Sequence, residues 1–426
     1  MAPKYNLSVL LFSRVVSEVG NMMFTFALSL FVLDTTESAF SYSLILGFSL
    51  LARTLGNIAS GNLADRLNKK NLIVSAEILN ALVLGILIVF LWREELNWTF
   101  TFFGSVLLNI FSSLLRVSTN AAIPELLKES QANKANGMFH SIGAISMIVG
   151  PLLAALFYEH VGLVFILFWS AISYGISAIL LLFLSNPDTE ISDTLKTTKK
   201  ITKEQVTNFK DAITYIRSYV LLYFFLRTAA MLNFILYPMM VLVMPYIVYQ
   251  VIGLTATGLS IIQAAWALGM TIGAAFIMRR NDTSHFMQKF FSYLLFQGIL
   301  IAGWAFASLS VLQDFNDWFI VSVYSVLVFF LGGLQMFVQI PLYSYFQFRI
   351  EKSYRGKVWG IANAMTDIAA PFGLWIYGIV LEGVEWYIVP LVTGILVVLM
   401  CTYFVTSKGS KGQIAKELSK PLQQGG

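Results

Sequence analysis

The sequence predicts an all-α membrane protein in which twelve transmembrane helices form two pseudo-symmetric six-helix bundles. Three observations support this fold class. Hydrophobic residues make up 57% of the 426 residues and charged residues only 12%, whereas soluble domains carry about 25% charged residues. The apolar residues gather in twelve runs, each long enough to cross about 30 Å of hydrocarbon. A polar stretch in the middle of the chain separates the first six runs from the last six.

The composition also excludes several classes of function. The formal net charge is +5 and the mean hydropathy is +0.74. The basic residues lie in loops between apolar runs rather than on one face, so we expect no nucleic-acid partner. Cys401 is the single cysteine and the three histidines are scattered, so neither a disulfide framework nor a metal site is expected. The chain has no phosphate-binding glycine loop, and we expect no cofactor.

The first apolar run follows a single basic residue, Lys4. Because this run is longer than the core of a signal peptide, we expect it to remain as the first span. Each later run is separated from the next by a short polar loop, except in the middle of the chain. The expected spans are 7–33, 40–61, 71–92, 99–118, 136–158, 162–184, 219–249, 257–278, 287–310, 318–346, 357–381 and 387–406.

The charged residues indicate how these spans are oriented. In the loops assigned to the outside, the only basic residue is Arg93, whereas acids such as Asp34 and Glu382 collect there. Apart from four arginines within spans, the other basic residues fall on the opposite side, which the positive-inside rule assigns to the cytoplasm. We therefore expect a multi-pass protein of the plasma membrane with both termini in the cytoplasm.

The middle of the chain and its end are polar. Within the middle stretch, residues 205–217 place Val206, Phe209, Ile213 and Ile216 on one helical face, which is typical of a helix on the inner membrane surface. The expected parts are an N-terminal bundle (1–185), a linker with this amphipathic helix (186–217), a C-terminal bundle (218–406) and a cytoplasmic tail (407–426).

Proline positions recur in the two halves. Pro124 near the end of the fourth span corresponds to Pro341 in the tenth, and Pro151 in the fifth corresponds to Pro371 in the eleventh. Facing six-span repeats are what an alternating-access carrier needs, because rocking one bundle against the other moves a central site between two faces.

The loop 61–70 joins the second and third spans, and its shortness makes these spans antiparallel neighbours. Its Gly61, Asp65, Arg66 and Lys70 match the pattern Gly-x-x-x-Asp-Arg-x-Gly-Arg-Arg/Lys, and the loop resembles the signature loop of major facilitator superfamily transporters. Asn68 and Lys69 replace the usual Gly and Arg. The resemblance implies a conformational latch, in which Asp65 holds helix N-termini or basic side chains in one state and releases them in the other.

Further stretches carry the resemblance across both halves. Residues 146–155, with Gly150 and Pro151, resemble the fifth-span motif of the superfamily's antiporters, although Ala154 and Ala155 stand where paired glycines are usual. Small residues permit close helix contact and Pro151 bends the helix. This motif is equally consistent with an exporter and with ordinary packing.

Residues 351–360, with Pro371 and Gly373 after them, resemble the macrolide-efflux-like branch of drug:proton antiporters, and so do residues 26–39. One position departs from that branch. Many such exporters carry an arginine at mid-depth in the fourth span, where this chain reads Leu108-Asn109-Ile110-Phe111. Arg116 lies closer to the cytoplasmic end, so the proton-relay role is not transferred to it.

Three carboxylates at membrane depth are the candidate proton-coupling residues: Glu18, Asp367 and Glu77. An ionisable group there costs at least about 2.5 kcal/mol and marks a functional site by default. Arg14 lies one turn before Glu18 and can pair with it. Either this ion pair breaks during transport and frees the Glu18 carboxylate, or it serves only to let the first span insert into the membrane.

The other two carboxylates also have alternative roles. Asp367 follows Trp359 and Asn363 at a spacing of four, a stripe expected to face the central cavity. There it binds a proton or cation, or is neutralised by an arginine; Arg227 is the candidate partner that we consider. Glu77 has Asn80 one turn later. Arg53 and Arg116 are expected at similar depth in neighbouring helices, which favours a structural role for Glu77.

Aromatic, methionine and amide side chains on the expected cavity helices form an adaptable apolar wall, suited to bulky amphipathic molecules. Pro238 and Pro245 are expected to weaken the outer half of the seventh span and to permit gating there. The candidate wall residues are Met22, Phe26, Asn233, Tyr237, Trp266, Gln335, Gln339 and Asn363.

The resemblance implies a monomeric, proton-coupled secondary active exporter of amphipathic or hydrophobic compounds such as macrolide antibiotics, driven by the proton gradient and working by alternating access. It is not expected to be an enzyme, because no nucleophile and base lie together at membrane depth. Another reading keeps the fold but moves an anionic amphiphile, as a lysolipid flippase or importer, or exports a metallophore or peptide. The four intramembrane arginines exceed the carboxylates by one, which favours anionic cargo.

Overall fold

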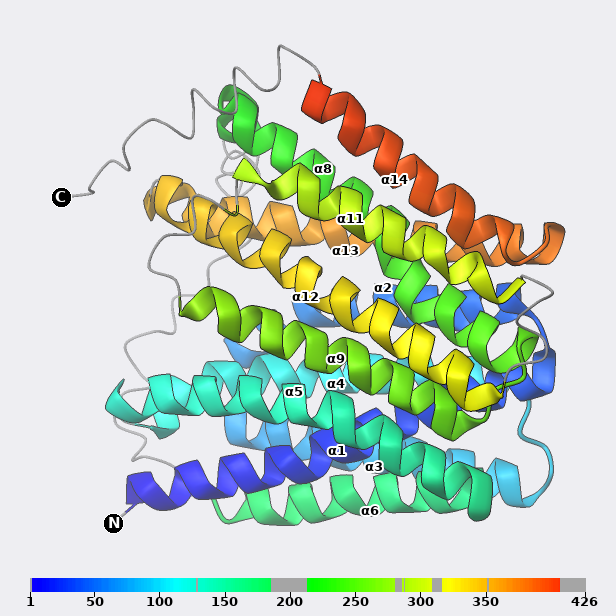
Figure 1. Ribbon diagram of the computed structural model, residues 1–426. Helices are drawn as coiled ribbons and strands as arrows, with labels where there is room; N and C mark the ends of the chain where they lie inside the picture. The colour runs from blue at the N-terminus through cyan, green and yellow to red at the C-terminus, as the bar shows by residue number, and fades with distance from the viewer. Residues whose placement is uncertain are drawn as a thin grey trace. The chain divides into compact units, whose positions relative to one another are not determined.

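A computed structural model of the chain describes residues 2–127, 129–184, 213–279, 286, 288–308, 316–350 and 352–406 (Figure 1). Regular structure in these ranges is helical throughout, which confirms the expected fold class. The helices of the first half are α1 (Ala2–Thr36), α2 (Ala39–Ala64), α3 (Lys69–Trp92), α4 (Trp98–Leu126), α5 (Glu129–His160) and α6 (Leu163–Leu182). Those of the second half are α8 (Val220–Pro238), η2 (Met239–Val243), η3 (Tyr246–Val251), α9 (Ala256–Met278), α11 (Phe290–Ala302), η4 (Gly303–Ser308), α12 (Asp317–Arg349), α13 (Lys352–Gly383) and α14 (Ile388–Thr406).

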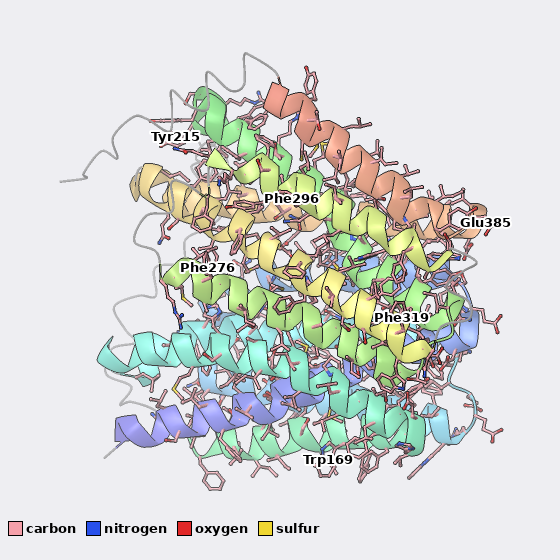
Figure 2. All side chains as sticks on the ribbon, in the orientation of Figure 1. Trp169, Tyr215, Phe276, Phe296, Phe319 and Glu385 are labelled. Carbon is pink, nitrogen blue, oxygen red and sulfur yellow. The ribbon has the colours of Figure 1, made fainter. Side chains whose placement is uncertain are left out.

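Eleven helical segments in the described residues are long and apolar enough to cross a membrane, and a shorter apolar helix, Ile388–Tyr403, provides the twelfth. Large apolar side chains cover the outside of both halves, among them Trp169, Phe276 and Phe296 (Figure 2), each about half exposed. Exposed apolar surface on this scale is unfavourable in water but matches a lipid environment.

Many of the helices begin directly after a short polar loop. At four of them a Ser or Asn side chain before the first turn accepts a hydrogen bond from a backbone N–H, which satisfies a donor that the helix leaves free. These bonds run from Ser41 N to Ser38 Oγ (3.0 Å), Asn71 N to Asn68 Oδ1 (3.2 Å), Thr99 N to Asn97 Oδ1 (3.0 Å) and Trp318 N to Asn316 Oδ1 (3.1 Å).

Helix contacts divide the chain into two compact units. The first comprises Met1–Thr198 and Thr255–Ser260, and the second comprises Lys199–Leu254 and Ile261–Gly426. In the first unit, α1 packs against α5 and α6, α2 packs against α4, and α3 packs against α4 and α6. The expected linker, except for the helical residues 213–217, and the expected tail lie outside the described residues, and the expected domain boundaries stay a prediction.

The second unit repeats the packing of the first. Here α8 packs against α13, and α11 packs against α12 and α14. The backbones of α9 and α12 also meet closely, because a Cβ at Gly269 would overlap the carbonyl group of Phe329. In order along the chain these pairs correspond to α1–α5, α3–α4, α3–α6 and α2–α4, so the two bundles are pseudo-symmetric.

The seventh span changes its winding at the two prolines. The α-helix α8 ends at Pro238, and the π-helical segments η2 and η3 follow, the second directly after Pro245. Proline has no N–H to donate to the carbonyl four residues earlier, so the regular α-helical ladder is interrupted there. The helix type thus changes in the outer half of this span, and the gating expected there stays a prediction.

Candidate functional site

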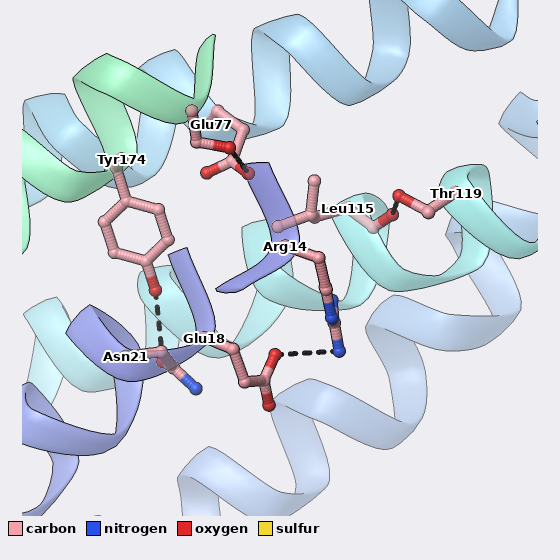
Figure 3. A network of polar contacts seen from close by, with 8 residues as sticks. Arg14, Glu18, Asn21, Glu77, Leu115, Thr119 and Tyr174 are labelled. Atoms are coloured by element: carbon pink, nitrogen blue, oxygen red, sulfur yellow. Dashed lines mark hydrogen bonds and ion pairs between the residues drawn. The ribbon is translucent and has the colours of Figure 1, made fainter. Parts of the chain in front are cut away.

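The described residues place a polar cluster inside the first unit, where α1 and α3 both lie against α6 (Figure 3). Its members are spaced one helical turn apart on each helix, so they share a face. The polar cluster consists of Arg14, Ser17, Glu18 and Asn21 of α1, Glu77 and Asn80 of α3, and Ser170, Tyr174 and Ser177 of α6.

Arg14 and Glu18 form the ion pair that their spacing predicts. Arg14 Nη2 lies 2.8 Å from Glu18 Oε2, and the two side chains are 21% and 14% exposed. The opposite charges of the two groups are therefore paired on one face of α1.

Glu77 lies deeper, with only 1% of the residue exposed. The hydroxyl of Ser177 on α6 donates to its Oε1 at 2.6 Å, and Ser17 of α1 is a second hydroxyl beside the carboxyl. Its Oε2 has no hydrogen-bond partner among the described residues. The same holds for both polar atoms of the Asn80 side chain, which is fully buried.

Helix α6 joins this carboxyl to α1 through further polar contacts. Tyr174 donates through its hydroxyl to Asn21 Oδ1 at 3.1 Å, and Ser170 Oγ donates to the carbonyl of Gly20 at 2.9 Å. Helix α1 approaches α6 closely there, because a Cβ at Gly20 would overlap the Ser173 side chain. These bonds fix α6 against both α1 and α3.

Arg53 and Arg116, which the sequence places at a depth similar to that of Glu77, make contacts elsewhere, and the structural role expected for Glu77 stays a prediction. No arginine contacts the Glu77 carboxyl in the described part of the chain. Arg116 of α4 instead donates to Asn57 of α2 at 2.9 Å, and the Arg53 carbonyl accepts from Ser113 at 2.9 Å. The Arg116 side chain and the Arg53 backbone thus contribute to the α2–α4 contact, while Glu77 lies on the face of α3 that packs against α6.

Residues 61–70, which were expected to form a loop, comprise the end of α2, a turn over 65–68 and the start of α3, and they have a structural role within the first unit. Asp65 ends α2, and its N–H donates to the carbonyl of Gly61 at 3.1 Å. Lys70 Nζ donates to the carbonyl oxygens of Leu182 (2.7 Å) and Leu184 (2.6 Å), at the end of α6. Asp65 and Arg66 are exposed. Their role as a conformational latch stays a prediction.

Gly150 permits the close contact between α5 and α1. A Cβ at this position would overlap the Cβ of Met22, and Pro151 follows inside the helix. Met22, expected in the cavity wall, is therefore engaged with α5, and Phe26 on the next turn is only 4% exposed. Both residues contribute to packing inside the first unit.

In the second unit, Asp367 is half-buried and Arg227 is exposed. The described residues show no ion pair between them, so the pairing considered from the sequence does not form. Asn233 donates to the carbonyl of Ala229 at 3.0 Å, and the buried Trp266 Nε1 has no partner in the described residues. Tyr237, Gln335 and Gln339 are half-buried, and the side chain of Asn363 lies outside the described residues. Their place in a cavity wall stays a prediction.

Three contacts near the candidate site could not be inferred directly from the sequence. Ser177 lies 100 residues from Glu77 and belongs to a run of small polar residues in α6 that looks like ordinary packing. Tyr174 and Lys70 also act on partners far away in the chain. The available signal was the spacing of Ser170, Ser173 and Ser177, a polar stripe on an otherwise apolar helix. Among the described residues, no group of three or more metal-ligating side chains is present.

Comparisons with known proteins match most of the chain. The family model of the Major Facilitator Superfamily matches residues 10–374. The chain is 25% identical over 405 residues to the uncharacterized MFS-type transporter YfiS of Bacillus subtilis (strain 168), covering 92% of this chain and 91% of that protein. It is 22% identical over 366 residues to macrolide efflux protein A of Streptococcus pyogenes, covering 85% of each chain. The crystal structure of the nucleoside transporter NupG superposes with a TM-score of 0.68 at 13% identity, covering 95% of this chain and all of that one, a likeness of fold alone.

Proposed function

This chain belongs to the Major Facilitator Superfamily, and we propose that it is a proton-coupled exporter of amphipathic compounds such as macrolide antibiotics. Membership of this family makes it a membrane transport protein and not an enzyme. The observation that carries this proposal is the similarity to macrolide efflux protein A, which extends over 85% of both chains. Rocking of the two repeats against each other opens the substrate site first to one side of the membrane and then to the other. The proton gradient supplies the energy.

Carboxyl groups at membrane depth support the coupling. Glu18, Glu77 and Asp367 lie within membrane-spanning helices, where an ionisable side chain is retained at a cost. A carrier that exchanges a proton for its substrate needs a carboxyl that changes protonation as the protein changes shape. We further propose a monomer in the plasma membrane with both termini in the cytoplasm.

The test is drug accumulation in energised cells that express the protein, with and without a protonophore. We expect cells to retain less macrolide when the protein is present, and this difference to disappear when the proton gradient collapses. Export that continues unchanged after collapse of the gradient would contradict the coupling. As a matched control, Glu95→Gln removes an exposed acid from the loop after α3 and is expected to export normally.

The same assay separates the proposal from anionic cargo. A competing lysolipid anion is expected to leave macrolide export nearly unchanged, whereas a second macrolide is expected to inhibit it. Inhibition by the lysolipid alone would favour the flippase or importer. Arg14 is already paired with Glu18, which removes one of the four arginines as a site for a free anion.

A further inference from the structure

The Glu77–Asn80 pair is the most unusual feature of the polar cluster. Glu77 is 1% exposed and Asn80 is fully buried. Glu77 Oε2, Asn80 Oδ1 and Asn80 Nδ2 all lack a hydrogen-bond partner among the described residues. Buried polar groups are nearly always paired, and leaving one unpaired costs about 1–3 kcal/mol. Three such atoms on adjacent side chains therefore call for a ligand or for a change of protonation.

The two side chains lie next to each other. Residues three apart on a helix share a face, with Cβ atoms about 5–6 Å apart. A side-chain amide can serve a carboxyl in either protonation state, because it carries both an acceptor oxygen and donor hydrogens. If the side chains turn toward each other, a protonated Glu77 can donate its O–H to Asn80 Oδ1, and an ionised Glu77 can accept a hydrogen bond from Asn80 Nδ2.

We propose that Glu77 is the carboxyl that binds the coupled proton, with Asn80 as the positioning residue that matches both of its protonation states. This inference rests on the proposed function and names the ion-binding residue within it. In the loading step, one proton from water adds to the Glu77 carboxylate, and the new O–H bonds to Asn80. In the release step that proton returns to water on the other side, and the amide turns to donate to Oε2.

The surrounding charges fit this assignment. The charged side chains that act on Glu77 are Arg14 and Glu18 of α1, and these neutralise each other at 2.8 Å. Helix α6 presents the hydroxyls of Ser177 and Tyr174. From α4, Arg116 is directed to Asn57 of α2. Among the described residues, the charges that act on Glu77 are therefore those of an ion pair with no net charge.

Burial also provides the coupling to conformation. Water cannot reach Glu77 while α3 stays packed against α6, because the residue is almost wholly enclosed. The Ser177 hydroxyl, which donates across this contact at 2.6 Å, must move away when the helices part. Proton exchange then requires α3 and α6 to part locally within the first unit, in addition to the rocking of the two repeats.

Infrared spectroscopy of the purified protein in lipid nanodiscs tests this inference without any substrate. We expect wild type to show the C=O band of a buried carboxylic acid that titrates with pH. The band is expected to disappear in Glu77→Gln and to remain in Glu18→Gln. In Asn80→Leu it is expected to shift in frequency, because the acceptor of its hydrogen bond is lost. Glu77→Asp keeps a carboxyl group and is expected to shift the frequency of the band. This variant tests the assignment if Glu77→Gln does not fold.

Three results would overturn the proposal. The first is a buried acid band that survives in Glu77→Gln, and the second is the complete absence of such a band from wild type. The third is loss of the band at fixed pH when sodium replaces choline in the buffer, because the pocket would then bind a metal cation instead of a proton.

Transport assays separate this proposal from the proposed function. If Glu77 titrates but a pH gradient drives no export, the proposed function fails and the proton site stands. If a pH gradient drives export equally well in wild type and in folded Glu77→Gln, the site assignment fails and the proposed function stands. We expect Glu77→Gln to lose the proton-driven component of export and to keep its binding of macrolide.

Discussion

Lys70 shows how a single side chain in this protein serves the end of a neighbouring helix. Its ammonium group donates to the carbonyl oxygens of Leu182 and Leu184, at 2.7 Å and 2.6 Å. We expect Lys70→Met to lower the free energy of unfolding by about 1–3 kcal/mol, because the carbonyls at the end of α6 lose their donor. Thermal unfolding of the purified protein in detergent measures this loss. Arg66→Gln, which removes the same charge from an exposed side chain of that loop, is the control and is expected to unfold like wild type.

The Arg14–Glu18 pair makes a second prediction at this scale. Glu18→Gln leaves Arg14 without its partner and is expected to lower the free energy of unfolding by up to about 3 kcal/mol. This value is at the low end of the range for a buried pair, because the side chains of Arg14 and Glu18 are 21% and 14% exposed. The double variant Arg14→Gln/Glu18→Gln is expected to recover part of that loss. A double-mutant cycle of unfolding free energies measures the coupling. Additive losses would show that the pair contributes nothing.

At the residue scale, local spacing predicted some contacts and missed others. The Arg14–Glu18 ion pair could be predicted from the sequence, because the two residues are four apart on one helix. The partners of Glu77 do not follow, because Ser177 is 100 residues away and reaches Glu77 only through the packing of α3 on α6. Similar depth of Arg53 and Arg116 also did not show that these residues take part in the contact between α2 and α4. Depth in the membrane does not say which face of a helix a side chain occupies.

At the element scale, the helices pack at positions where a side chain would not fit. Gly150 of α5 lies against Met22 of α1, and a Cβ there would overlap the Met22 Cβ, which cannot swing away. Overpacking of this kind costs about 1–3 kcal/mol. We therefore expect Gly150→Ala to lower the unfolding temperature and the yield of folded protein.

Gly143 on the same helix gives the matched control. A Cβ at Gly143 meets nothing within 4 Å, so Gly143→Ala is expected to be neutral or to stabilise by up to about 1 kcal/mol, because alanine favours the helix. Equal unfolding temperatures for the two alanine variants would contradict the close contact between α1 and α5.

Hydropathy predicted that the helices exist but not where they end. The span expected over 99–118 belongs to α4, Trp98–Leu126, and the span expected over 136–158 belongs to α5, Glu129–His160. These helices continue with polar residues past the apolar run, where hydropathy carries no signal. The ninth span, in contrast, changes to the 3₁₀ segment η4 at Gly303. Backbone hydrogen bonding, which hydropathy does not report, decides these ends.

At the scale of the whole molecule, the pairing of helices within each unit is the repeat that the proline positions indicated. The sequence could indicate two similar halves, but letter-by-letter similarity is too low to show which helices pair. That information appears only in the packing, for example where α3 meets α6 and α11 meets α14.

The even number of spans predicts that both termini lie on the same side of the membrane. Single cysteines added at each chain end are expected to react with a membrane-impermeant maleimide only after the cells are opened. The background is low because the one native cysteine, Cys401, is buried. A cysteine in the loop at Glu95, which is assigned to the outside, is expected to react in intact cells. Labelling of one terminus but not the other in intact cells would contradict an even number of spans.

Proton movement by the purified protein tests the central claim most directly. Wild type and Glu77→Gln are reconstituted into liposomes with a pH-sensitive dye inside, and a macrolide gradient is imposed in the absence of a pH gradient. We predict that macrolide movement drives protons in the opposite direction in wild type and not in Glu77→Gln. Macrolide movement without any change in internal pH in the wild-type liposomes would contradict the account.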